Sequence, residues 1–213
     1  MTALRICCVG DSITLGTGDA HYLGWPGRVS AAEAARGHDL SLYNLGVRGD
    51  TSFMIAERWR AECAARLPDE YPGALIFAFG VNDTAAEEGI GLRVDYERSL
   101  VIAREIIVAA AKWKKTMWLA PAPLSDRHGS LPSPTGVQRR FRDARVRRLS
   151  AAYAAIADEL GVSYLDLHGF LVDDARWRQA VAAGDGIHPA ADGYALMADL
   201  IGRWDAWRKW MDG

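Results

Sequence analysis

Two short polar motifs near opposite ends of the 213-residue chain carry the residue types of a nucleophile and its base. Ser12 stands in Gly-Asp-Ser-Ile-Thr, directly after an apolar run, where a strand-to-helix turn can present a hydroxyl beside a helix N-terminus. Asp185 and His188 stand three residues apart in Asp-Gly-Ile-His-Pro. At that spacing the carboxylate can hydrogen-bond one ring nitrogen and leave the other free to take a proton. Taken alone, each motif is also typical of a capped turn.

Two further motifs could stabilise negative charge on a reacting oxygen. Gly46, in Asn-Leu-Gly-Val-Arg-Gly, follows a second apolar run, and a glycine there lets a backbone N–H approach a ligand closely. Asn82, in Gly-Val-Asn-Asp, follows a third run and can aim its side-chain amide at an oxyanion. The alternatives are a plain turn for the glycine and a helix cap for the asparagine.

Short apolar runs alternate with helical patterns along the chain, which predicts an α/β fold with a parallel sheet and right-handed crossovers. The predicted strands are Leu4–Val9, Leu40–Asn44, Ala74–Phe79, Thr116–Ala120 and Ser163–Leu167. The predicted helices cover roughly 26–36, 51–66, 92–113, 137–160 and 190–211. Ligands of such sheets bind beyond the carboxyl ends of the strands, where the four motifs and the Pro/Ser/Gly-rich loop Pro121–Gly136 are expected.

Together the four motifs resemble the blocks of the SGNH, or GDSL-type, hydrolase family. The resemblance extends from residue 4 to about residue 200, and Ile13 stands where the family name expects leucine. It implies a flavodoxin-like three-layer α/β/α sandwich with a five-stranded parallel sheet, formed by residues 1–213 as one domain.

The resemblance also implies roles for individual residues. Ser12 would attack an ester carbonyl, His188 would act as base and then acid, and Asp185 would orient the imidazole. The Ser12 N–H, the Gly46 N–H and the Asn82 side chain would form the oxyanion hole. The expected substrate is a small carboxylic ester, with short acyl chains, O-acetyl groups and thioesters all open, and no cofactor or metal is expected.

Some residues have two interpretations. The six arginines between 139 and 148 could form an anion or nucleic-acid patch, or they could be the solvated face of the predicted helix 137–160. The net charge of −2 favours the solvated face. The apolar side of that helix would consist of Val137, Phe141, Ala144, Leu149 and Tyr153. Trp204, Trp207 and Trp210 predict core packing or, secondly, a homo-oligomer interface.

Other residues near the motifs have one expected role each. Asp11 is expected to brace the nucleophile turn and Trp25 to pack in the core. Tyr22 is expected to lie nearer the cleft, and Arg127 and His128 to touch substrate.

Composition narrows the class of protein. No run is long enough for a membrane span, and the near-neutral charge gives no reason to expect nucleic acid as a partner. Three cysteines without paired spacing, and no leader pattern, predict a cytoplasmic protein.

Two other hypotheses remain: a flavodoxin-like module that binds an anion without chemistry, and a metal site of Asp11, Asp185 and His188. Loops 84–91, 121–136 and 171–184 are expected to shape the substrate pocket.

Overall fold

The computed structural model describes residues 3–125, 130–133 and 136–213. Within them, five strands form an all-parallel central sheet in the order β2-β1-β3-β6-β9, which is the flavodoxin-like order that the resemblance implied. The strands are β1 (Leu4–Gly10), β2 (Leu40–Gly46), β3 (Gly73–Ala78), β6 (Lys115–Leu119) and β9 (Ser163–Leu165). The predicted fold class is thus confirmed, with strand boundaries displaced by no more than two residues.

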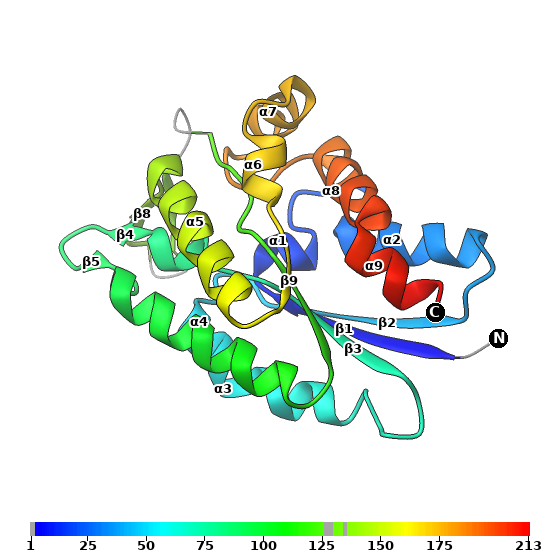
Figure 1. Ribbon diagram of the computed structural model, residues 1–213. Helices are drawn as coiled ribbons and strands as arrows, with labels where there is room; N and C mark the ends of the chain where they lie inside the picture. The colour runs from blue at the N-terminus through cyan, green and yellow to red at the C-terminus, as the bar shows by residue number, and fades with distance from the viewer. Residues whose placement is uncertain (1–2, 126–129, 134–135) are drawn as a thin grey trace.

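Helices cover both faces of this sheet, which explains why its strands are apolar almost throughout (Figure 1). One layer comprises α3 (Ser52–Ala64), α4 (Tyr96–Ala111) and α5 (Asp143–Glu159). The other comprises α2 (Gly24–Ala35), α8 (Ala191–Arg203) and α9 (Asp205–Met211). Alternate residues of β1 point to opposite layers: Cys7 and Val9 pack with α3 and α4, and Ile6 and Cys8 pack with α2 and α8.

The predicted helix 137–160 is wrong in its first turns, because α5 begins only at Asp143. Residues Gln138–Arg140 instead form β8, the third strand of a small antiparallel sheet. The sheet has the order β5 (Gly91–Leu92), β4 (Ala86–Glu87), β8 and β7 (Ser130–Pro132). Pairing with distant strands on both sides overrides the local helical spacing. Ala144, predicted on the apolar side, is exposed, whereas Phe141, Leu149 and Tyr153 are buried.

The predicted last helix is two helices, because the backbone of Trp204 is extended between α8 and α9. Trp207 is fully buried and donates its indole N–H to Glu33, while Trp204 and Trp210 pack partly buried against the same core. The packing interpretation of the three tryptophans is confirmed, and a homo-oligomer stays a prediction.

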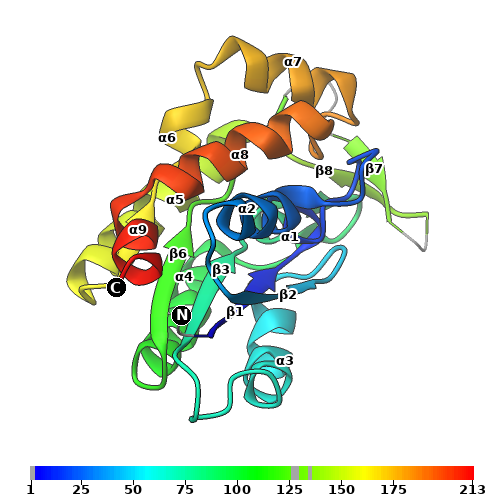
Figure 2. The same cartoon turned by 90° about the vertical axis from the view of Figure 1, so that its right-hand side faces the viewer.

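The segment 171–184 is mostly helical and not a loop. It contains α7 (Ala175–Ala183) and follows α6 (Leu167–Leu171), and the two short helices lie above the ends of the central strands (Figure 2). Of the loop 121–136, the structure describes residues 121–125, 130–133 and 136, so Arg127 and His128 lie outside the described residues. No helix in the described part of the chain has the length and apolar character of a membrane span.

Candidate active site

The structure brings the serine, the histidine and the aspartate of the two terminal motifs into one chain of contacts. Ser12 Oγ lies 2.7 Å from His188 Nε2, although the two residues are 176 positions apart. His188 Nδ1 lies 2.7 Å from Asp185 Oδ2. When Nδ1 carries the ring proton and donates it to the carboxylate, Nε2 is left to accept the Ser12 hydroxyl proton.

Ser12 is positioned by a tight turn between β1 and the short helix α1 (Ser12–Leu15). Asp11 caps this helix, and its Oδ1 accepts a hydrogen bond from the Ile13 N–H at 2.9 Å. A side chain at Gly10 would place its Cβ 2.2 Å from the carbonyl oxygen of Ala78 on the neighbouring strand. The turn therefore needs glycine at its start. The Ser12 N–H, one of the amides at the helix N-terminus, has no acceptor in the described part of the chain.

The Asp185–His188 turn is held by the same carboxylate that contacts the ring. Asp185 Oδ1 accepts from the backbone N–H groups of Ile187, at 3.0 Å, and His188, at 2.8 Å. Burial favours the neutral acid, but the hydrogen bonds from the His188 ring and from these amides outweigh it and lower the pKa of Asp185 to about 2. The group behind the histidine is therefore a carboxylate at neutral pH.

Asn82 reaches the same edge from the single turn η1 (Asn82–Thr84) that follows β3. Its Nδ2 donates to Asp11 Oδ2 at 3.3 Å, which leaves the second amide hydrogen without a described acceptor. Burial raises the pKa of Asp11 to about 6, against the lowering effect of its bond from Ile13 and of nearby His188. The expected bracing role of Asp11 is confirmed, and the structure adds its contact with Asn82.

The expected position of Gly46 is wrong. Its N–H donates to Asn44 Oδ1 at 3.0 Å, and a Cβ on it would lie 2.2 Å from the backbone nitrogen of Leu15. Strand β2 continues to Gly46, so the chain leaves the strand and reaches the site only three residues later, at Gly49. Gly49 borders the cleft with a φ of +80°, and its N–H has no acceptor among the described residues. A φ in this range favours glycine, so the second glycine of Asn-Leu-Gly-Val-Arg-Gly was the sequence signal for the residue that borders the site.

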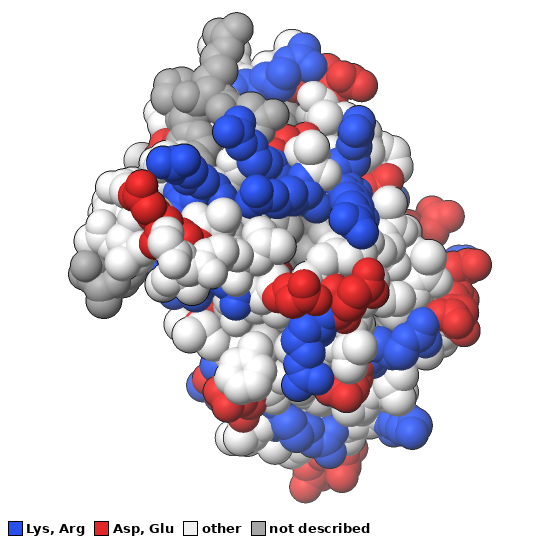
Figure 3. Space-filling model, turned by 90° about the vertical axis from the view of Figure 1, so that its left-hand side faces the viewer, with Lys and Arg blue, Asp and Glu red and all other residues white. Residues whose placement is uncertain are grey.

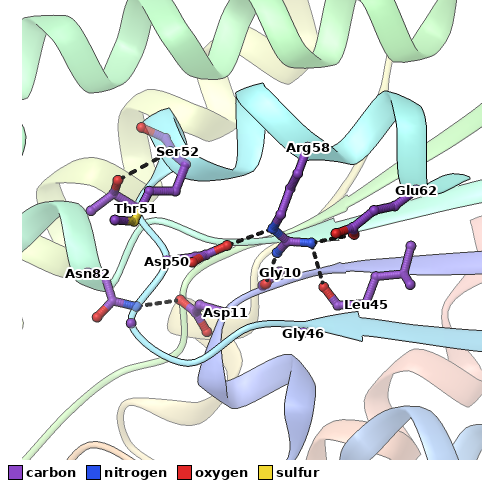
Figure 4. A network of polar contacts seen from close by, with 12 residues as sticks. Gly10, Asp11, Leu45, Gly46, Asp50, Thr51, Ser52, Arg58, Glu62 and Asn82 are labelled. Atoms are coloured by element: carbon purple, nitrogen blue, oxygen red, sulfur yellow. Dashed lines mark hydrogen bonds and ion pairs between the residues drawn. The ribbon is translucent and has the colours of Figure 1, made fainter. Parts of the chain in front are cut away.

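Arg58 on α3 connects the strand ends that carry these groups, as Figure 4 shows. Its guanidinium donates to the carbonyl oxygens of Gly10, at 2.8 Å, and Leu45, at 3.0 Å. Its Nε donates to the carboxylate of Asp50, at 2.7 Å, directly after Gly49. The role of Arg58 could not be predicted from the sequence, because nothing in an amphipathic helix distinguishes it from a solvated arginine.

These groups open onto a cleft of about 390 Å³. Ser12, Gly49, Asn82 and His188 form one wall of the cleft, which we call the strand-end wall. A second part of the lining comes from the small antiparallel sheet, with Leu131, Pro132 and Ser133 from β7 and its end, and Arg139 and Phe141 from β8 and the residues after it. We call it the small-sheet wall. Segment 171–184 does not contribute to the lining.

The remaining candidates lie elsewhere. Tyr22, expected nearer the cleft, is 92% exposed and does not line it, whereas Trp25 is fully buried as predicted. His168 is buried with its Nε2 3.2 Å from Asp143 Oδ1, and it does not line the cleft. Within the described ranges, no group of three or more His, Cys, Asp or Glu side chains could hold a metal ion.

The strand order and the Ser–His–Asp contact at the strand ends define a flavodoxin-like α/β protein with the arrangement of a serine hydrolase. Residues 8–196 match the model of the GDSL-like Lipase/Acylhydrolase family, and the chain belongs to that family.

Individual relatives agree with this assignment. The chain is 26% identical over 216 residues to an acetylxylan esterase of Xylanibacter ruminicola, an alignment that covers 93% of this chain and 42% of that protein. The lipase/acylhydrolase from Enterococcus faecalis has the same fold, with a TM-score of 0.77 and 21% identity over 98% of this chain and 97% of that one. A G-D-S-L family protein from Veillonella parvula gives a TM-score of 0.71 and 22% identity, over 93% and 96% of the two chains.

Proposed function

We propose that this protein is a serine hydrolase that cleaves small carboxylic esters through an acyl-enzyme intermediate. The observation that carries the proposal is the continuous contact from Ser12 through His188 to Asp185. Beside it lie the N–H groups of Ser12 and Gly49 and the second amide hydrogen of Asn82, which have no acceptor among the described residues. An anion-binding module needs the donors, but it does not need a hydroxyl in contact with a base that is itself held by a carboxylate.

In the first half of the reaction, His188 Nε2 takes the hydroxyl proton while Ser12 Oγ attacks the ester carbonyl. The resulting oxyanion is stabilised by the N–H groups of Ser12 and Gly49 and by the Asn82 amide. The imidazolium, stabilised by Asp185, then protonates the departing alcohol, and Ser12 retains the acyl group. In the second half, water attacks the acyl-enzyme by the same route and releases the acid.

The proposed substrates are short-acyl esters, with O-acetylated sugars first among them and thioesters as further candidates. A cleft of about 390 Å³ accommodates a small acyl group and part of an alcohol. The curated relative is named an acetylxylan esterase, which supports testing acetyl esters of sugars first.

Covalent labelling tests the proposal directly. A fluorophosphonate probe should label the protein, and Ser12→Ala should abolish the labelling and lower turnover of 4-nitrophenyl acetate by about a millionfold. Ser130→Ala, which removes an exposed hydroxyl on β7, is the matched control and should leave labelling intact. If the native protein binds small anions yet neither reacts with the probe nor cleaves any ester, it is a binding module and the proposal is wrong.

A further inference from the structure

The cleft carries a positive charge that ester cleavage itself does not require. Among the described residues that line it, two are arginines, Arg48 and Arg139, and none is Asp or Glu. Ester hydrolysis by the proposed route needs a nucleophile, a base and N–H donors, and neither arginine contacts any of these side chains. Their presence in the lining calls for a role in binding.

Arg139 is held in the small-sheet wall with its guanidinium directed to the cleft. Its Nε donates to Glu87 at 2.8 Å across the β4–β8 pair, and its side chain is only 18% exposed. Its Nη1 lies 3.6 Å from the position that a Cβ on Gly49 would occupy. The outer edge of the guanidinium therefore faces the glycine whose N–H we assign to the oxyanion hole, and it has no acceptor within the described residues.

Glu87 does not neutralise this wall. The same Oε1 atom also contacts Arg93, whose Nε lies 3.4 Å away and whose Nη1 donates to the Gly49 carbonyl oxygen. One carboxylate thus faces two guanidinium groups, and Arg93 also interacts electrostatically with Asp83 and Asp50, whereas the outer edge of Arg139 is left to the cleft.

Arg48 adds a second charge from the strand-end side. It directly precedes Gly49, its side chain is exposed, and it makes no hydrogen bond or ion pair in the described part of the chain. Neighbouring Asp50 is buried and accepts from Arg58 at 2.7 Å, and no ion pair joins it to Arg48 within the described ranges. Both arginines therefore line the cleft close to Gly49, Arg48 as its neighbour in the chain and Arg139 through the outer edge of its guanidinium.

We propose that the ester cleaved by this enzyme carries a carboxylate, which binds between Arg48 and Arg139 while the ester carbonyl lies at Ser12. A carboxylate has two oxygens, so each guanidinium can donate to one of them, and charge-assisted bonds of this kind are stronger than neutral ones. The side of the molecule that carries β8 and the start of α5 is also rich in basic side chains, as Figure 3 shows, which favours the approach of an anionic substrate. The inference rests on the proposed ester hydrolysis and narrows its substrate class.

Matched ester pairs test the inference. One pair is 4-acetoxybenzoate and its methyl ester, which place the carboxylate or its neutral form in the alcohol half. The other is 4-nitrophenyl hydrogen succinate and its methyl ester, which place the same groups in the acyl half. The readout is the ratio of kcat/KM for the charged member to that for the neutral member. Intrinsic reactivity cancels when this ratio is compared between the wild type and a variant.

In at least one pair, Arg48→Gln and Arg139→Gln should each lower the ratio by about tenfold, and added salt should lower it in the wild type. The matched control is Arg140→Gln, the next residue of β8, whose side chain is 64% exposed on the opposite side of the strand. It removes the same charge without touching the cleft, and the ratio should stay within about twofold of that of the wild type.

Three outcomes would overturn the inference. Ratios within about twofold of wild type in both cleft variants would show that neither arginine binds the anion. An equal fall in Arg140→Gln would show a general charge effect. Failure of the wild type to cleave any of the four esters would overturn the inference alone if the fluorophosphonate probe still labels Ser12, and would remove the ester hydrolase proposal with it if the probe does not react and no other ester is cleaved. Arg48→Gln decides the case if Arg139→Gln fails to fold, because Arg48 is exposed and unpaired.

Discussion

The two walls of the cleft are built from different kinds of sheet. In the strand-end wall, Ser12 and Asn82 follow β1 and β3 of the central sheet, most of whose residues are buried between two helical layers. Gly49 and His188 come from the turns after β2 and before α8. The small-sheet wall rests on β7 and β8, which have three residues each and alternate between exposed and partly buried positions. The first wall holds every side chain of the Ser–His–Asp contact or supports it, and the second holds none.

This difference indicates a division of work between the walls. The 2.7 Å contact between Ser12 Oγ and His188 Nε2 needs a rigid support, which the close-packed end of β1 provides for Ser12 and the Asp185 hydrogen bonds provide for the turn of His188. A short and partly exposed sheet tolerates changes of side chain more readily, and so suits the recognition of one substrate among many esters. Variants of the strand-end wall should therefore slow the cleavage of every ester, and variants of the small-sheet wall should change which ester is preferred.

The largest effect after loss of the nucleophile is expected for Asp185→Asn. The amide cannot stabilise the imidazolium and favours the wrong ring tautomer, so kcat should fall by about 10⁴-fold for charged and neutral esters alike. Steady-state kinetics on both matched pairs measure it, with the exposed Asp192→Asn on α8 as control. A fall of less than about a hundredfold would mean that Asp185 does not serve the histidine.

A smaller loss is expected for Asn82→Ala, which removes one proposed oxyanion donor. We expect kcat to fall by about 10²- to 10³-fold on all esters, with little change in KM. Asn44→Ala is the comparison variant, because it removes an amide that contacts Gly46 outside the cleft. If the two variants lost activity equally, the effect would be one of general support and Asn82 would not be a donor to the reacting oxygen.

The smallest effect is expected for Leu131→Ala in the small-sheet wall. Loss of part of an apolar contact should raise KM by about two- to tenfold for the esters that reach β7. The test is a series of acetyl, butyryl and octanoyl esters, in which the order of preference should change more than kcat does. A uniform fall in kcat across the series would break the proposed distinction between the walls.

Much of the strand-end wall could be predicted from the sequence, because its signals are local. Buried parallel strands are continuous apolar runs, so all five were found to within two residues. The Asp185–His188 pair lies within one turn, and its spacing alone brings the carboxylate to the ring. The meeting of Ser12 with His188 was expected from the resemblance and from the rule that ligands bind at the strand ends.

The sequence did not reveal the parts that depend on contacts between distant segments. Whether Gly46 or Gly49 faces the cleft depends on how far β2 pairs with β1, and that pairing reaches Gly46. Arg139 was assigned to a solvated helix, because its β-conformation comes from pairing with β4 and β7. Arg58 carries no local mark, because its acceptors come from two other strands and a loop.

The sequence alone thus determined the α/β fold class, the positions of the strands along the chain and the residue types available for chemistry. Each of these follows from periodicity or from spacing within a few residues. Only the tertiary structure decided which glycine N–H is free, which arginines enter the cleft and what encloses it. Those properties depend on backbone pairing and burial between segments far apart in the chain. The local sequence permits several arrangements, and the one adopted is the one in which the buried backbone N–H and C=O groups find hydrogen-bond partners.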